Sequence, residues 1–339
     1  MKQSDRMLEE VFETLGHSTK RIKPEKFNAI LEKHLPFPTK VVPLDNPSVA
    51  GYMHPVIIDG KFIGAKLALP YDEFLGHTKL DGENIDTAFH ELAHATHCKV
   101  DPRIAANQGN LEKLVASKSQ IAPDVDYSGI NTKINTLYEK IFYGWEIPPQ
   151  KREGFVEGIL AGGESKTQAI KNRLKYIEEE TEKIANEIPD NELKIAFLKR
   201  IRNGLRTEDY AWGQGTKFKA QAEINKSVQS LVEKDGKIDE LLELEAKDKP
   251  TYLKKINEYF EKANFCKKQE ELTSNIEWNN DVAYMFGEKI NYLNDKIATL
   301  IRTERRNMVF NKALEKSSSG KLILPNTIEK KSKFIDVAA

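Results

Sequence analysis

The stretch Asp86-Thr-Ala-Phe-His90-Glu91-Leu-Ala-His94 contains the pattern H-E-x-x-H. Residues four apart in an α-helix share a face, so the imidazoles of His90 and His94 can reach one metal ion. Glu91 lies beside them, where its carboxylate can take a proton from a water molecule at that ion. This combination is typical of zinc hydrolases that cleave peptide bonds. We therefore expect Zn²⁺ at His90 and His94, and a catalytic role for Glu91.

The residues around the motif predict a helix that is half core and half active site. Its apolar side chains recur at three- and four-residue spacing, as expected for one buried stripe, with the histidines on an adjoining edge. The stripe consists of Ile85, Ala88, Phe89, Leu92 and Ala93. Small residues such as Ala93 and Ala95 let other elements approach this helix closely.

A catalytic zinc ion generally takes three protein ligands and leaves one position for water. No histidine follows His97, so we expect the third ligand to be a carboxylate. A ligand-bearing helix must lie close to the motif helix, which favours a glutamate with small residues at i−3 and i+4. Two glutamates meet this condition equally well, Glu157 and Glu223. The remaining candidates are Glu153, Glu139 and Asp101.

Four other side chains near these segments have expected roles. His97 shares the face of His90, but one straight helix cannot easily direct three rings to one ion, so we expect it at the rim of the site or supporting a ligand. Cys98 is expected to be a buried small hydrophobe rather than a metal ligand. Tyr143 and Tyr210 are candidates for stabilising the oxyanion of a cleaved carbonyl group.

Composition excludes several classes of partner. The 339 residues carry 52 basic and 52 acidic side chains, and this balance provides no net field to attract nucleic acid. Only Cys98 and Cys266 occur, so the chain is not a disulfide scaffold. No apolar run approaches the roughly 18 residues of a membrane span, and the amino terminus lacks an apolar signal segment. We expect cytoplasmic synthesis, and any export by a route that needs no signal peptide.

The order of patterns along the chain predicts an α+β fold that is mostly helical, with a small zincin-like sheet. Residues 6–34 have helical periodicity, and three apolar runs then indicate strands at 41–44, 54–58 and 61–69. Asp59-Gly60 between two of these runs predicts a hairpin. The polar stretch 102–129 is expected to be a flap over the cleft. Helical segments are predicted near 165–188, 190–205, 216–233, 250–265 and 268–315.

These patterns divide the chain into four regions. We expect amino-terminal helices at 1–39 and a zincin-like metalloprotease core at 40–163. A helical region at 164–316 would recognise the substrate and could supply a ligand, and 317–339 would be a flexible tail.

The stretch from His54 to Cys98, with its hairpin, the Ala68-Leu-Pro70 turn and Phe89-His-Glu-Leu-Ala-His94, resembles the metallopeptidase domain of antirestriction and toxin-associated gluzincins. The resemblance implies a glutamate ligand on a later helix, which Arg152-Glu153-Gly-Phe-Val-Glu157 fits loosely. The whole chain resembles bacterial effector metalloproteases, one of which cleaves actin. That resemblance implies secretion into a host cell and a host protein substrate, such as a cytoskeletal protein.

Two functions follow from these observations. The first is a zinc-dependent endopeptidase that cleaves a protein substrate. The alternative is a non-cleaving, antirestriction-type binding module on a metallopeptidase fold. The intact Glu91 favours the enzyme, because a protein that only binds has no use for a general base.

Overall fold

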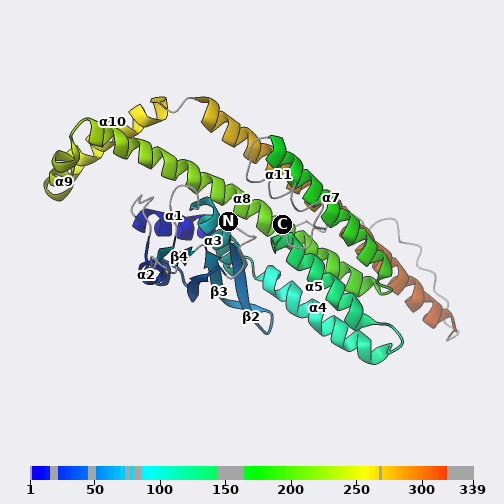
Figure 1. The fold of residues 1–339 in the computed structure, drawn as a ribbon. Coiled ribbons are helices and arrows are strands. Elements are labelled where there is room, and N and C mark those ends of the chain that lie inside the picture. Colours follow the sequence, from blue (N-terminus) through cyan, green and yellow to red (C-terminus); the bar gives the residue numbers. More distant parts are fainter. Residues whose placement is uncertain are drawn as a thin grey trace. The chain divides into compact units, whose positions relative to one another are not determined.

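The computed structural model describes residues 2–15, 22–44, 51–69, 71–72, 77–78, 85–143, 164–266 and 269–318. The chain divides into two compact units, residues 1–293 and 294–339. Helices dominate the described residues, and the strands lie in the first unit (Figure 1). The expected α+β, mostly helical composition is therefore confirmed.

Two amphipathic helices begin the chain, as predicted. Helix α1 (Lys2–Thr14) buries Leu8 and Val11, and helix α2 (Pro24–His34) buries Phe27 and Leu31. Proline is favourable at the first position of α2, because the first amide of a helix has no partner within the helix. Both helices contribute these side chains to the core that supports the motif helix.

A three-stranded sheet follows, in the order β1-β3-β2. Strand β1 (Thr39–Pro43) pairs in parallel with β3 (Lys61–Leu69), and β2 (Tyr52–Ile58) pairs with β3 antiparallel. Asp59 and Gly60 join β2 to β3 with φ angles of 50° and 71°, the left-handed conformation that a two-residue hairpin turn requires. The hairpin prediction is confirmed. A separate antiparallel pair is formed by β4 (Tyr71–Asp72) and β5 (His77–Thr78).

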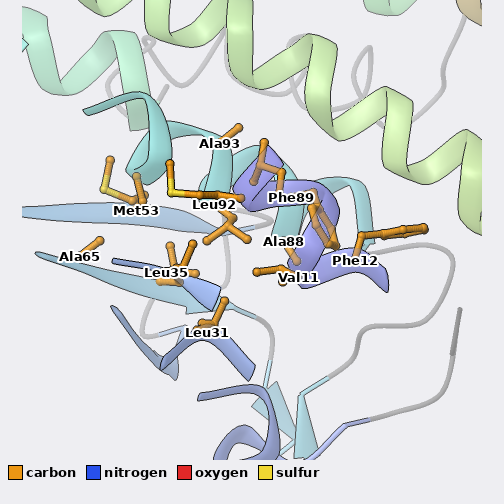
Figure 2. Close-up of a cluster of buried hydrophobic side chains, with 14 of the residues drawn as sticks. Val11, Phe12, Leu31, Leu35, Met53, Ala65, Ala88, Phe89, Leu92 and Ala93 are labelled. Carbon is orange, nitrogen blue, oxygen red and sulfur yellow. The ribbon is translucent and has the colours of Figure 1, made fainter. Parts of the chain in front are cut away.

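Helix α3 (Ile85–Val100) carries the H-E-x-x-H motif and packs on the sheet. Its apolar stripe is buried, as expected. Figure 2 shows these side chains meeting residues of α1, of the segment around α2, and of β2 and β3. The ring centroids of Phe12 and Phe89 lie 5.4 Å apart, and those of Phe89 and Phe218 lie 4.3 Å apart. The motif helix is thus held from several directions by one continuous core.

The predicted flap over 102–129 is wrong. Residues Pro102–Ile121 form helix α4, and Tyr127–Tyr143 form helix α5. Asp101 is the amino-terminal cap of α4, since its side chain accepts a hydrogen bond from the Arg103 amide at 3.1 Å. The motif helix ends at Val100, just before Asp101-Pro102, and Pro102 then starts a new helix in which Leu111 and Val115 bury an apolar face.

A second difference concerns helix α8, which extends without interruption over Asn191–Lys234. The sequence pattern predicted two separate helices, near 190–205 and 216–233, and the stretch between them contains the weak helix formers Gly213 and Gly215. Packing against α3, α4, α5 and α10 supports the helix through that stretch and outweighs the intrinsic cost of the glycines. Asp190 caps its start by accepting from the Leu193 amide at 2.9 Å.

The remaining helices extend from this scaffold. Helix α7 (Glu164–Glu187) contacts α5 and α8, while α9 (Ile238–Lys247) and α10 (Lys249–Cys266) form a small core with the end of α8. Helix α11 (Gln269–Ser318) begins in the first unit, where Lys289 pairs with Glu178 of α7. Among the described helices, none is long and apolar enough to cross a membrane.

Candidate metal centre

Three side chains from two helices converge beside the sheet. The Nε2 atoms of His90 and His94 lie 3.1 Å apart. Glu208 of α8 places one carboxylate oxygen 3.6 Å from Nε2 of His90 and the other 3.5 Å from Nε2 of His94. Among the described residues, these three form the group whose ligand atoms all lie within 4.8 Å of one another. His90, His94 and Glu208 could therefore hold one metal ion.

The spacing of these atoms is compatible with one metal ion. With Zn–N bonds of about 2.0–2.1 Å, neighbouring ligand atoms in a tetrahedron are about 3.3 Å apart. The two Nε2 atoms, 3.1 Å apart, are close to that value, and each lies within 3.6 Å of one of the two Glu208 carboxylate oxygens. Two imidazoles and one carboxylate also suit zinc chemically and leave one position open for water.

Glu208 was not among the candidates from the sequence. It lies in the stretch 206–215, for which the sequence pattern predicts no helix, and it does not meet the spacing condition, because Leu205 is at i−3 and Trp212 at i+4. Its small neighbours are instead Gly204 at i−4 and Ala211 at i+3. Both are buried, which is consistent with the close approach of α8 to α3.

Of the five carboxylates predicted as candidates for the third ligand, the structure describes the side chain of Asp101 alone. Glu157 and Glu153 lie outside the described residues, as do the side chains of Glu139 and Glu223. The backbone of Glu223 belongs to α8, fifteen residues beyond Glu208 and therefore about 22 Å further along the helix axis. Asp101 caps α4 and forms an ion pair with Arg103 at 2.8 Å. Among the described side chains, the carboxylate that lies at the two histidines is that of Glu208.

Glu91 is buried next to this group, with 8 % of its surface exposed. The backbone amide of Met53 in β2 hydrogen-bonds to its carboxylate and fixes its position relative to the sheet. The pKa of Glu91 is raised to about 7, because burial and the negative charge of Glu208 outweigh the opposing effects of His90, Met53 and Arg173. A carboxylate with this pKa can both accept and return a proton near neutral pH.

The two histidines have different proton affinities. Burial lowers the pKa of His94 to about 3, so this ring is neutral and ready to bind a metal. Burial also disfavours the charged form of His90, but the hydrogen bond and charge of Glu208 outweigh it and raise the pKa of His90. Burial likewise opposes ionisation of Glu208, whose pKa is nevertheless lowered by the charges of His94, His90 and Arg173.

Arg173 and Trp212 complete the surroundings of the group. Arg173 of α7 donates to the carbonyl oxygen of Ile141, and its charge lowers the pKa values of both Glu91 and Glu208. Burial lowers the pKa of Arg173 itself, against the attraction of these two carboxylates. Trp212 of α8 is half-buried, and its ring lies edge-on to His90 with centroids 5.1 Å apart.

The other predicted side chains lie around this centre. His97 is buried one turn beyond His94, and its ring centroid lies 5.0 Å from that of Tyr210. Cys98 is buried as expected, and burial raises the pKa of its thiol to about 12. The hydroxyl of Tyr210 is engaged with α1, where it donates to Asp5 at 2.7 Å, instead of facing the ligand group. The side chain of Tyr143 lies outside the described residues.

Comparison of the chain with protein-family models, with curated proteins and with solved structures gives no match in any of the three. The functional argument therefore depends on the geometry of the site itself.

Proposed function

We propose that this protein is a zinc-dependent peptidase that cleaves a protein substrate. The observation that supports this function best is the close grouping of His90, His94 and Glu208, with ligand atoms within 4.8 Å of one another, beside the buried carboxylate of Glu91. His90, His94 and Glu208 would hold the ion, and Glu91 would act as the general base. The zincin-like character of the fold belongs to the same proposal.

Bound zinc would supply Lewis acidity, which makes water more acidic and a carbonyl group more electrophilic. Glu91 accepts the proton of the attacking water and returns it to the leaving amine. Its carboxylate is buried beside His90, and burial favours the protonated form that returns the proton. The amide of Met53 keeps the carboxylate oriented between the two steps.

The charges of the site favour an anionic transition state. Glu208 would offset one charge of a divalent cation, and Arg173 adds one further positive charge within electrostatic reach of Glu208 and Glu91. Because Glu91 becomes neutral when it accepts the proton of water, the site would keep a net positive charge while negative charge develops on the oxygen of the cleaved carbonyl group. Buried, fixed charge of this kind lowers the barrier, since it needs no reorganisation during the reaction.

Two features support a polypeptide as the substrate. Among the described strands, β2 has β3 as its one pairing neighbour, and the contact of Met53 with Glu91 places β2 next to the site. An extended peptide can hydrogen-bond to a strand edge of this kind. Trp212 offers a half-buried aromatic surface beside His90, on which a substrate side chain can pack.

The test compares wild-type protein with the Glu91→Gln variant, which keeps the shape of the side chain but removes the base. Both are loaded with one equivalent of zinc and incubated with lysates of bacterial and of eukaryotic cells, and new peptide termini are mapped by mass spectrometry. We expect termini that depend on Glu91, and their source separates a bacterial substrate from a host protein such as actin. Zinc binding without any such termini would reject peptidase activity and support a non-cleaving binding module.

A further inference from the structure

A buried polar network joins α1 to both ligand-bearing helices. The Tyr210 hydroxyl on α8 donates to Asp5 at 2.7 Å and lies 2.8 Å from the hydroxyl oxygen of Ser4. Ser4 donates to Thr96 of α3 at 2.6 Å, and Gln214 of α8 donates to Asp5 at 3.1 Å. We name these five residues the α1 polar network.

On each ligand-bearing helix, one residue of the network lies two positions after a proposed metal ligand. Thr96 follows His94 by two residues, and its hydroxyl also bonds to the carbonyl oxygen of Ala93, directly before that ligand. Tyr210 follows Glu208 by two residues. A shift of α3 against α8 would therefore disturb the network and the ligand group together.

The surroundings of the network are apolar. Ser4 and Thr96 have no exposed surface, and α1, α3 and α8 also meet through the rings of Phe12, Phe89 and Phe218. The buried ring of His97 packs beside Tyr210. Apolar contacts hold the helices together but are not directional. Hydrogen bonds between buried groups are directional, and leaving one unmade costs about 1–3 kcal/mol. The network therefore adds directional constraints on the helix register to the packing of the apolar core.

We infer that Ser4, Asp5, Thr96, Tyr210 and Gln214 are positioning residues, through which α1 holds Glu208 in register with His90 and His94 and so sets the affinity of the site for zinc. This inference rests on the proposed zinc centre. It assigns a function to the first helix of the chain, which contributes no residue to the ligand group.

The test measures zinc affinity in full-length protein by competition with a chromophoric chelator, and the absorption spectrum of the Co²⁺-loaded protein. In Tyr210→Phe the ring remains and the hydroxyl is lost. We expect the dissociation constant for zinc to rise about 10-fold or more, as is typical when a supporting partner of a metal site is removed. The Co²⁺ spectrum should change with it. Ser4→Ala should have a similar effect, and the double variant should be far from additive, because the two residues belong to one network.

Tyr259→Phe is the matched control. Its hydroxyl donates to Asp235 at 3.0 Å near the far end of α8, and its loss should leave zinc affinity unchanged. Asp5→Asn is a second, milder variant, since Asp5 is only half-buried, and its folding is checked by circular dichroism. Zinc affinity within twofold of wild type in the folded Tyr210→Phe and Asp5→Asn variants would overturn the inference, even if both lose thermal stability. A different result would contradict the proposed function itself: stoichiometric zinc binding by the His90→Ala/His94→Ala double variant.

Discussion

The Nε2 atom of His94 lies 3.5 Å from a carboxylate oxygen of Glu208, although one residue belongs to the motif helix and the other to the middle of a 44-residue helix. Contact between α3 and α8 creates this proximity. The proposed metal centre is therefore a product of tertiary packing, and its ligand set can be tested residue by residue.

The first prediction concerns the third ligand. Glu208→Gln removes the negative charge and one strong ligand, so zinc affinity should fall by at least about 100-fold. Glu223→Gln, on the same helix, should bind zinc like wild type. Competition titrations with a chelator measure both variants under identical conditions. Equal losses of affinity in the two variants would mean that Glu208 is not the ligand.

The second prediction concerns Arg173. Arg173→Met should lower kcat for a short peptide substrate by about 10²–10³-fold with KM little changed, because the positive charge acts on the transition state. Arg173→Lys keeps the charge and should lose less. Zinc content and the Tm of both variants are measured alongside. A rise in KM with kcat preserved would instead assign Arg173 to substrate binding.

The third prediction links His97 to acid stability. Burial lowers the pKa of His97 to about 4, whereas in the unfolded chain it is near 6.5. Between these values the unfolded state binds more protons, so stability is full above pH 6.5 and falls as the pH drops toward 4, by about 3 kcal/mol in total. His97→Gln should flatten this part of the profile of unfolding free energy against pH, measured by urea denaturation in the presence of a chelator.

The control for this profile is His54→Gln, because His54 is exposed on β2. Its pH profile should follow that of wild type. An unchanged slope between pH 4 and 6.5 in His97→Gln would show that His97 is not the group responsible.

The fourth prediction tests the continuity of α8. Gly213 is exposed within the helix, and a Cβ atom there would meet nothing within 4 Å. Gly213→Ala should therefore stabilise the protein by about 0.5–1 kcal/mol, because alanine has the higher helix propensity. Gly236 follows the end of α8 with a φ of 63°, so Gly236→Ala should destabilise by about 1 kcal/mol. Thermal unfolding of both variants measures whether stability rises in Gly213→Ala and falls in Gly236→Ala. A destabilised Gly213→Ala variant would argue against a regular helix at that position.

The sequence alone predicted those elements that are determined by residues close together along the chain. The motif itself, the buried stripe that includes Phe89 and Leu92, and the Asp59-Gly60 turn were all predicted, and the structure contains them. Each depends on side-chain periodicity or on backbone preferences within a few residues. The same local reasoning failed for α4 and for the middle of α8, where burial against neighbouring helices outweighs weak intrinsic propensity.

The sequence by itself predicted a metal site at His90 and His94, because one turn of helix fixes their spacing. It also predicted a carboxylate as the third ligand. Only the tertiary structure brought Glu208 forward as the proposed ligand, because Glu208 reaches the histidines through the packing of α8 on α3 and not through any spacing along the chain. The positions of Arg173, Trp212 and Tyr210 depend on the same packing, in which contacts between distant segments set distances that a linear pattern does not record.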